Sequence, residues 1–115
     1  MDTETEKKID ELDFQKGGGL IPVIVEDYNT KKVLTLAYMN KESLKETIDT
    51  GFATYYSRTR KKLWLKGETS GNFQEVKNIS YDCDKDTLLM AVIPKGPACH
   101  TGKYSCFYEK LYERD

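Results

Sequence analysis

The chain has 115 residues, a formal net charge of −1 and a hydrophobic fraction of 38%. This length is typical of one domain with a single core, and the balanced charge argues against nucleic-acid binding by bulk electrostatics. No apolar run approaches the roughly 18 residues of a membrane span, and the charged start of the chain lacks the apolar core of a signal peptide. We therefore expect a cytoplasmic protein with no nucleic-acid or membrane partner.

The first part of the chain predicts an N-terminal extension followed by a hairpin. Residues 1–13 are mostly polar and predict either a short helix or a disordered arm, which leaves residues 14–115 as the main domain. The β-branched segment 20–26 and the segment 32–39 flank a polar turn, which is typical of a β-hairpin. Pro22 indicates either an edge strand or the start of a strand.

The remainder predicts one helix and several strands. Residues 41–50 are expected to be helical, because Asn40 is a good N-cap and Gly51 is well suited to end a helix. Further strands are predicted at 52–58, 63–66, 73–81 and 87–94, with a last short strand at 103–108. The predicted fold is α+β and mostly β, with small barrel-like twisted sheets and one principal helix.

Three carboxylates alternate along one short stretch, at Asp82, Asp84 and Asp86. In a flat strand they would share one face, but the outer two would lie roughly 13 Å apart, too far for a single cation. A shared ion therefore requires a turn or bulge here. A calcium loop of the EF-hand type is excluded, because Thr87 and Ile93 occupy its glycine and glutamate positions. The alternative is a solvated acidic turn.

The three cysteines of the chain are Cys83, Cys99 and Cys106. An odd number fits a disulfide framework poorly, and the spacing is not that of a zinc finger. Three thiolates would leave the fourth tetrahedral position of zinc open, as in catalytic sites. The alternative is that the cysteines are small buried apolar residues. Cys99 beside His100, and Cys83 between two aspartates, favour metal ligation.

His100 is the only histidine, and three roles are open to it: a zinc ligand, a general base or a core imidazole. Basic residues gather around one predicted turn, at Arg58, Arg60, Lys61, Lys62 and Lys66. Guanidinium groups bind phosphate bidentately, and the backbone amides of the loop 67–72 are suited to cradle an anion. The cluster therefore indicates a phosphate site, with a solvated hairpin tip as the alternative.

Taken together, these motifs resemble the phosphoribosyl-AMP cyclohydrolase family of histidine biosynthesis. The stretches that carry the resemblance are GGGLIPVIVED, LTLAYMN, FATYYSRTRKKLWLKGETSGN, DCDKDTLL and ACHTGKYSCFY. They follow one another from about Phe14 to Tyr108 and match at every metal position. Lys103-Tyr104 stands where the family often has arginine. Because the sequence stops at Asp115, we expect no fused phosphoribosyl-ATP pyrophosphatase domain.

The resemblance implies a homodimer that shares zinc between its chains. Cys83 would come from the partner chain, and Cys99 and Cys106 from the other. It also implies that magnesium binds the three aspartates, Asp82, Asp84 and Asp86. The nucleotide substrate is expected to contact Arg58, Arg60, Lys66, Glu68, Thr69 and Ser70.

The activity implied is metal-dependent hydrolysis of 1-(5-phosphoribosyl)-AMP, which opens the adenine ring at the N1–C6 bond. Because three thiolates weaken the acidity of zinc, a helper base is needed, and His100 is our hypothesis for it. Two alternatives differ in kind: a zinc-stabilised binding module with no reaction, and an enzyme that deaminates the same carbon.

Overall fold

The computed structural model describes all residues from 1 to 115 and has two helices, six strands and one short 3₁₀ turn. The helices are α1 (Thr3–Asp10) and α2 (Lys41–Thr50), and the 3₁₀ turn spans Gln15–Gly17. The strands are β1 (Ile21–Asp27), β2 (Val33–Met39), β3 (Thr54–Ser57), β4 (Lys62–Leu65), β5 (Gln74–Tyr81) and β6 (Leu88–Pro94). The predicted α+β class is confirmed.

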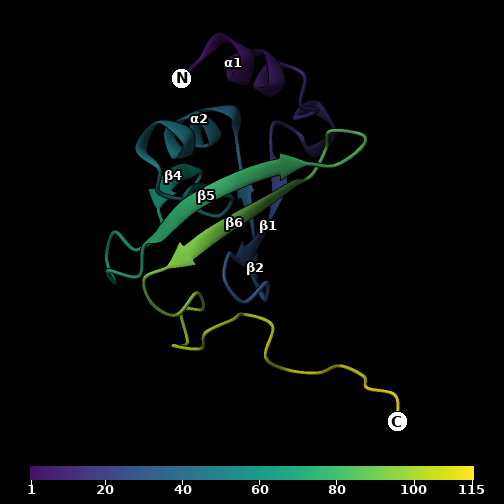
Figure 1. Cartoon of the computed structure of the whole chain (residues 1–115), viewed down its shortest axis with the longest axis vertical. Coiled ribbons are helices and arrows are strands. Elements are labelled where there is room, and N and C mark those ends of the chain that lie inside the picture. Colours follow the sequence, from purple (N-terminus) through teal and green to yellow (C-terminus); the bar gives the residue numbers. More distant parts are fainter.

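Four strands form the main sheet in the order β2-β1-β6-β5, and β3 pairs with β4 in a separate two-stranded sheet (Figure 1). β1 is antiparallel to β2 and parallel to β6, whereas β5 and β6 form an antiparallel hairpin. The sheets are twisted, as predicted, but both are open and do not close into a barrel. Pro22 lies near the start of β1, which is a central strand rather than an edge.

Local signals in the sequence explain the helix α2. The Asn40 side chain accepts from the Ser43 amide, and the Ser43 hydroxyl bonds back to the Asn40 amide, forming a capping box. Gly51 ends the helix with a left-handed φ of 82°. The buried Thr47 hydroxyl then hydrogen-bonds the backbone of Thr54, which fixes α2 against β3.

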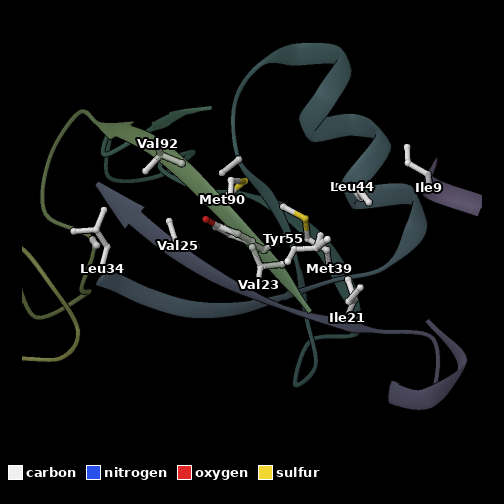
Figure 2. Packing of buried hydrophobic residues seen from close by; sticks show 13 residues of the cluster. Ile9, Ile21, Val23, Val25, Leu34, Met39, Leu44, Tyr55, Met90 and Val92 are labelled. Atoms are coloured by element: carbon white, nitrogen blue, oxygen red, sulfur yellow. The ribbon is translucent and has the colours of Figure 1, made fainter. Parts of the chain in front are cut away.

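The core lies between the inner face of the main sheet, α2 and the β3–β4 hairpin (Figure 2). Alternate residues of β1 are fully buried, as expected for a strand with one face toward the core. Tyr55 from β3 fills the centre and packs on Trp64. The predicted N-terminal helix forms, and α1 contributes Ile9 to the core with only 3% of its surface exposed.

The predicted last strand at 103–108 is wrong. This segment has no partner strand, and it is held instead by the Cys106 amide, which donates to the Leu34 carbonyl at 2.7 Å, and by the buried Ser105 hydroxyl, which donates to the Val33 carbonyl at 2.7 Å. The residues after Cys106 continue away from the body of the fold as an extended tail (Figure 1). No helix of the chain has the length and apolar character to cross a membrane.

Candidate active site

A pocket of about 490 Å³ opens beside the β3–β4 hairpin and is closed by the loops that follow β4 and β6. A volume of this size is typical of small-molecule sites. The structure brings into it eight of the residues singled out from the sequence: Arg60, Lys66, Glu68, Thr69, Ser70, Cys99, His100 and Cys106. His100 is exposed to solvent at its rim.

The thiols of Cys99 and Cys106 both line this pocket, close enough for each to shift the pKa of the other. The Thr101 hydroxyl donates to the Cys99 sulfur at 3.0 Å, and hydrogen bonding from Thr101 holds the pKa of the Cys99 thiol below its ordinary value. Burial raises the pKa of the Cys106 thiol, although a hydrogen bond with Thr35 opposes the rise. The pair is therefore chemically unequal, with Cys99 the more easily ionised.

Lys66 supplies the positive charge of the pocket nearest to these sulfurs. Partial burial lowers the pKa of its ammonium group, while the charges of Cys106 and Cys99 act in the opposite direction. A half-buried cation beside two thiols favours their thiolate forms, which are the forms that bind metal ions.

The three aspartates gather in the turn between β5 and β6. Their ligand oxygens all lie within 4.8 Å of one another, so the turn required by the sequence argument is present. Lys85 adopts a left-handed φ of 62°, and Asp82 accepts from the amides of Asp86 (3.1 Å) and Thr87 (3.2 Å). These contacts close the turn and direct the carboxylates toward one point.

A cation of the chain itself already contacts this carboxylate cluster. Lys16 lies 2.6 Å from Asp86 and 3.7 Å from Asp84. The Lys16 hydrogen bond lowers the pKa of Asp86 to about 2, whereas hydrogen bonding with Asp86 raises the pKa of Asp84. Three clustered oxygen ligands with one shared counter-charge fit a hard divalent cation.

Cys83 lies in the same turn and is exposed, far from the other two cysteines. The turn is at the Tyr81–Leu88 end of the β5–β6 hairpin, and the loop with Cys99 follows the opposite end, after Pro94 (Figure 1). The seven residues of β6 span roughly 20 Å at about 3.3 Å per residue. Within one chain, Asp82, Asp84 and Asp86 form the only group of three or more His, Cys, Asp or Glu side chains that lie close enough together to share a metal ion.

The predicted substrate residue Arg58 does not line the pocket. Its guanidinium stacks over the Tyr38 ring at 4.0 Å, and the side chain borders a separate depression beside Gly18 and Gly19. Sequence reasoning missed other residues of the thiol pocket, Thr35, Leu65, Ala98 and Gly102, whereas Gly67 and Asn72 belong to the loop predicted to cradle an anion. Nothing local distinguishes the missed residues, because they reach the pocket only through tertiary packing. Trp64 of β4 also lines it.

The fold and this site define a small α+β domain with a cationic, thiol-bearing pocket of the size that an enzyme uses for a small-molecule substrate. The family model described as phosphoribosyl-AMP cyclohydrolase matches residues 35–108. The chain belongs to the phosphoribosyl-AMP cyclohydrolase family, and it is an enzyme of that family.

Individual relatives agree with this assignment. The chain is 60% identical to a phosphoribosyl-AMP cyclohydrolase of Cenarchaeum symbiosum, over 92% of this chain and 98% of the relative. It is 63% identical to one of Archaeoglobus fulgidus, over 88% and 93% of the two chains. A histidine biosynthesis bifunctional protein HisIE of Bacillus subtilis is 60% identical over 93% of this chain, which spans only 51% of that longer protein.

Proposed function

We propose that this chain hydrolyses 1-(5-phosphoribosyl)-AMP in the cytoplasm, opening the N1–C6 bond of the adenine ring as a step of histidine biosynthesis. The observation that carries the proposal is the pairing of Cys99 and Cys106 in a pocket that also holds Arg60 and Lys66. In such a pocket the thiols can bind a soft metal ion beside the reacting ring, and the cations can bind the phosphates of the same substrate. Three free cysteines also suit a reducing compartment.

The donor sets fit the two metals that the family resemblance implies. Cys99 and Cys106 would hold zinc, because both thiols line one pocket and the pKa of Cys99 is lowered. Asp82, Asp84 and Asp86 would hold magnesium through hard oxygen atoms.

The third thiol of the zinc set would come from a second copy of the chain. Roughly 20 Å separates the two ends of β6, so Cys83 is out of reach of Cys99 in its own chain. A surface suited to a partner is present on the outer face of the main sheet. Ile24 pairs with Leu36 on one side and with Leu89 on the other, and these last two are 45% and 39% exposed. Exposed apolar rows of this kind mark interaction surfaces.

The residues of the pocket have separate roles in the proposed reaction. When bound, zinc supplies a water whose pKa is lowered toward about 7. His100, at the rim, would take the proton from the water that adds to C6 of the N1-alkylated ring. Lys66 and Arg60 would bind phosphate oxygens, and the loop of Glu68, Thr69 and Ser70 would close over the substrate.

A spectrophotometric assay with phosphoribosyl-AMP tests the proposal, run with and without a zinc chelator and followed in parallel by circular dichroism. The expected result is ring opening without release of ammonia, lost on chelation before the fold is lost. Release of ammonia would identify a deaminase instead. Unfolding on chelation with no turnover in the metal-loaded protein would identify a zinc-stabilised binding module.

Mixing two inactive variants tests the sharing of zinc. Cys83→Ser and Cys99→Ser are each expected to lose zinc and activity as homodimers. A mixed dimer has one intact site, so subunit exchange at equal concentrations should restore about a quarter of the wild-type zinc content and activity. No recovery after demonstrated exchange would refute the shared site, and zinc retained by Cys83→Ser alone would place all ligands in one chain.

A further inference from the structure

Asp27 is a buried carboxylate that takes no part in either site described above. It ends β1 and is only 5% exposed. One carboxylate oxygen accepts from the amides of Asn29 (2.8 Å) and Thr30 (3.2 Å), which closes the β1–β2 turn. The other oxygen accepts from the Tyr104 hydroxyl at 2.6 Å. The Asp27 carboxylate therefore joins the β1–β2 turn to Tyr104, which lies between Cys99 and Cys106 in the sequence.

The proton order in this cluster follows from the groups present. An ionised carboxylate only accepts, so the Tyr104 hydroxyl must donate to Asp27. In its 2.7 Å contact with the Thr30 hydroxyl, the Tyr104 oxygen then accepts and Thr30 donates. The Thr30 oxygen in turn accepts from the Lys32 amide at 3.2 Å. Every group has a partner, and phenylalanine at 104 would leave one buried oxygen of Asp27 without a donor.

Tyr104 is also the main polar attachment of the loop that carries Cys99. Within residues 98–104, the Ala98 amide donates to the Tyr104 carbonyl at 3.2 Å and the Cys99 amide donates to the Lys103 carbonyl at 3.1 Å. These bonds stay inside the loop. Apart from the contact between the two thiols, the only hydrogen bonds from residues 98–104 to the rest of the fold pass through the Tyr104 hydroxyl.

The second thiol is fixed independently. The Cys106 amide donates to the Leu34 carbonyl of β2 at 2.7 Å, two residues beyond Tyr104. One thiol is thus anchored to a strand, whereas the loop of the other is held by the packing of Ala98 in the core and by the polar attachment of Tyr104 to the β1–β2 turn. The distance between the two sulfurs is set by both anchors together.

The geometry points to Tyr104 as a positioning residue, whose hydroxyl, held by Asp27 and Thr30, fixes Cys99 beside Cys106 for a soft metal ion. The metal part of this inference rests on the proposed function, whereas the placement of the thiol is independent of it. Tyr104 acts on the reaction only through the loop, because it lines no part of the pocket.

Tyr104→Phe tests this inference, with two measurements on the full-length protein. Zinc affinity is measured by competition with a chromophoric chelator, and it is expected to fall about 10- to 100-fold, as for the loss of other groups that orient metal ligands. In the metal-free protein, each thiol is labelled with an aromatic disulfide and followed by peptide mass mapping. Cys99 is expected to react faster than in the wild type, with glutathione in the same mixture as the reference thiol.

Tyr108→Phe is the matched control, because this tyrosine is in the same segment and 46% exposed. It should leave both measurements unchanged. If Tyr104→Phe lowers the melting temperature while zinc affinity and the Cys99 to glutathione labelling ratio stay at wild-type values, the residue is only structural and the inference is overturned.

Thr30→Val is the second variant, and it decides the matter if Tyr104→Phe fails to fold. It removes one partner of the Tyr104 hydroxyl and keeps the bond to Asp27, so a smaller rise in Cys99 labelling is expected, and an unchanged ratio overturns the inference. If the wild-type protein binds no zinc, the proposed zinc site fails. The labelling ratio then still supports or overturns the positioning role.

Discussion

Replacing Gly67 by alanine gives a sharp test of how the loop over the pocket is built. A Cβ atom at this position would lie 2.6 Å from both the Asn72 carbonyl carbon and the Phe73 nitrogen, which are backbone atoms. The residue also has a φ of +94°. Gly71, in the same loop, has a similar φ of +82° but has no atom within 4 Å of an added Cβ. Gly71→Ala is therefore a control that has the backbone strain without the overlap.

Gly67→Ala is expected to lower the stability about twice as much as Gly71→Ala. A side chain at positive φ costs about 1–2 kcal/mol, and this applies to both positions. At Gly67 the loop backbone must also move, which adds about 1–3 kcal/mol, as in other overpacked sites. With about 4 °C of melting temperature lost per kcal/mol, Gly71→Ala should lower the melting temperature by roughly 4–8 °C and Gly67→Ala by roughly 8–20 °C.

Thermal unfolding followed by circular dichroism measures this difference, and steady-state kinetics measures its effect on the pocket. Because Gly67 lines the pocket, displacement of the loop in Gly67→Ala should raise KM for phosphoribosyl-AMP well above its value in Gly71→Ala. Equal melting temperatures for the two variants would show that the loop gives way freely, and the close approach at Gly67 would then have no role in shaping the pocket.

Four further predictions concern single side chains. Burial alone would raise the pKa of Asp27, but hydrogen bonds from Tyr104 and the turn amides hold this pKa below its usual value. The ionised Asp27 therefore stabilises the fold above about pH 4, and this stabilisation is lost as the pH falls through the folded-state pKa. Urea unfolding at pH 7 and pH 3 should show this loss in the wild type and not in Asp27→Asn. Lys16→Gln removes the ammonium beside the carboxylate cluster, so titration calorimetry should show tighter magnesium binding, and weaker binding would make Lys16 a supporting residue. His100→Ala should lower kcat far more than zinc content, and an equal loss of both would make the imidazole a ligand. Arg60→Ala should raise KM more than it lowers kcat, and more than Arg58→Ala does, because only Arg60 lines the thiol pocket; the opposite ranking would return Arg58 to the role predicted from the sequence.

Much of the fold could be predicted because its signals are local. The helix at 41–50 has its cap at Asn40 and its end at Gly51, and both act within a few residues. For the three aspartates, the sequence predicted that a shared ion requires a turn, because only a turn brings alternate side chains to one point, and the structure has this turn.

Features that depend on distant partners could not be predicted in the same way. Residues 103–108 look like a short strand in the sequence, but Ser105 and the Cys106 amide hydrogen-bond the start of β2, and the segment joins no strand ladder. The sheets stay open rather than forming a barrel for a similar reason, because the patterns of β2 and β5 do not show which segments lie along these edges, and the edge of β5 takes only the isolated bridge from Phe52 to Glu75. Arg58 and Arg60 look equivalent in the sequence, yet the hairpin directs only Arg60 into the pocket.

The place of Cys83 among the carboxylates has one more consequence. Because Cys83 lies between Asp82 and Asp84 along the chain, any surface that binds its sulfur also lies within a few ångströms of these aspartates. If the proposed dimer forms, dissociation of its subunits would separate the proposed magnesium ion from the proposed zinc ion in the same event. Specific activity should then decline steeply on dilution, and both ions should become easier to extract at the same protein concentration.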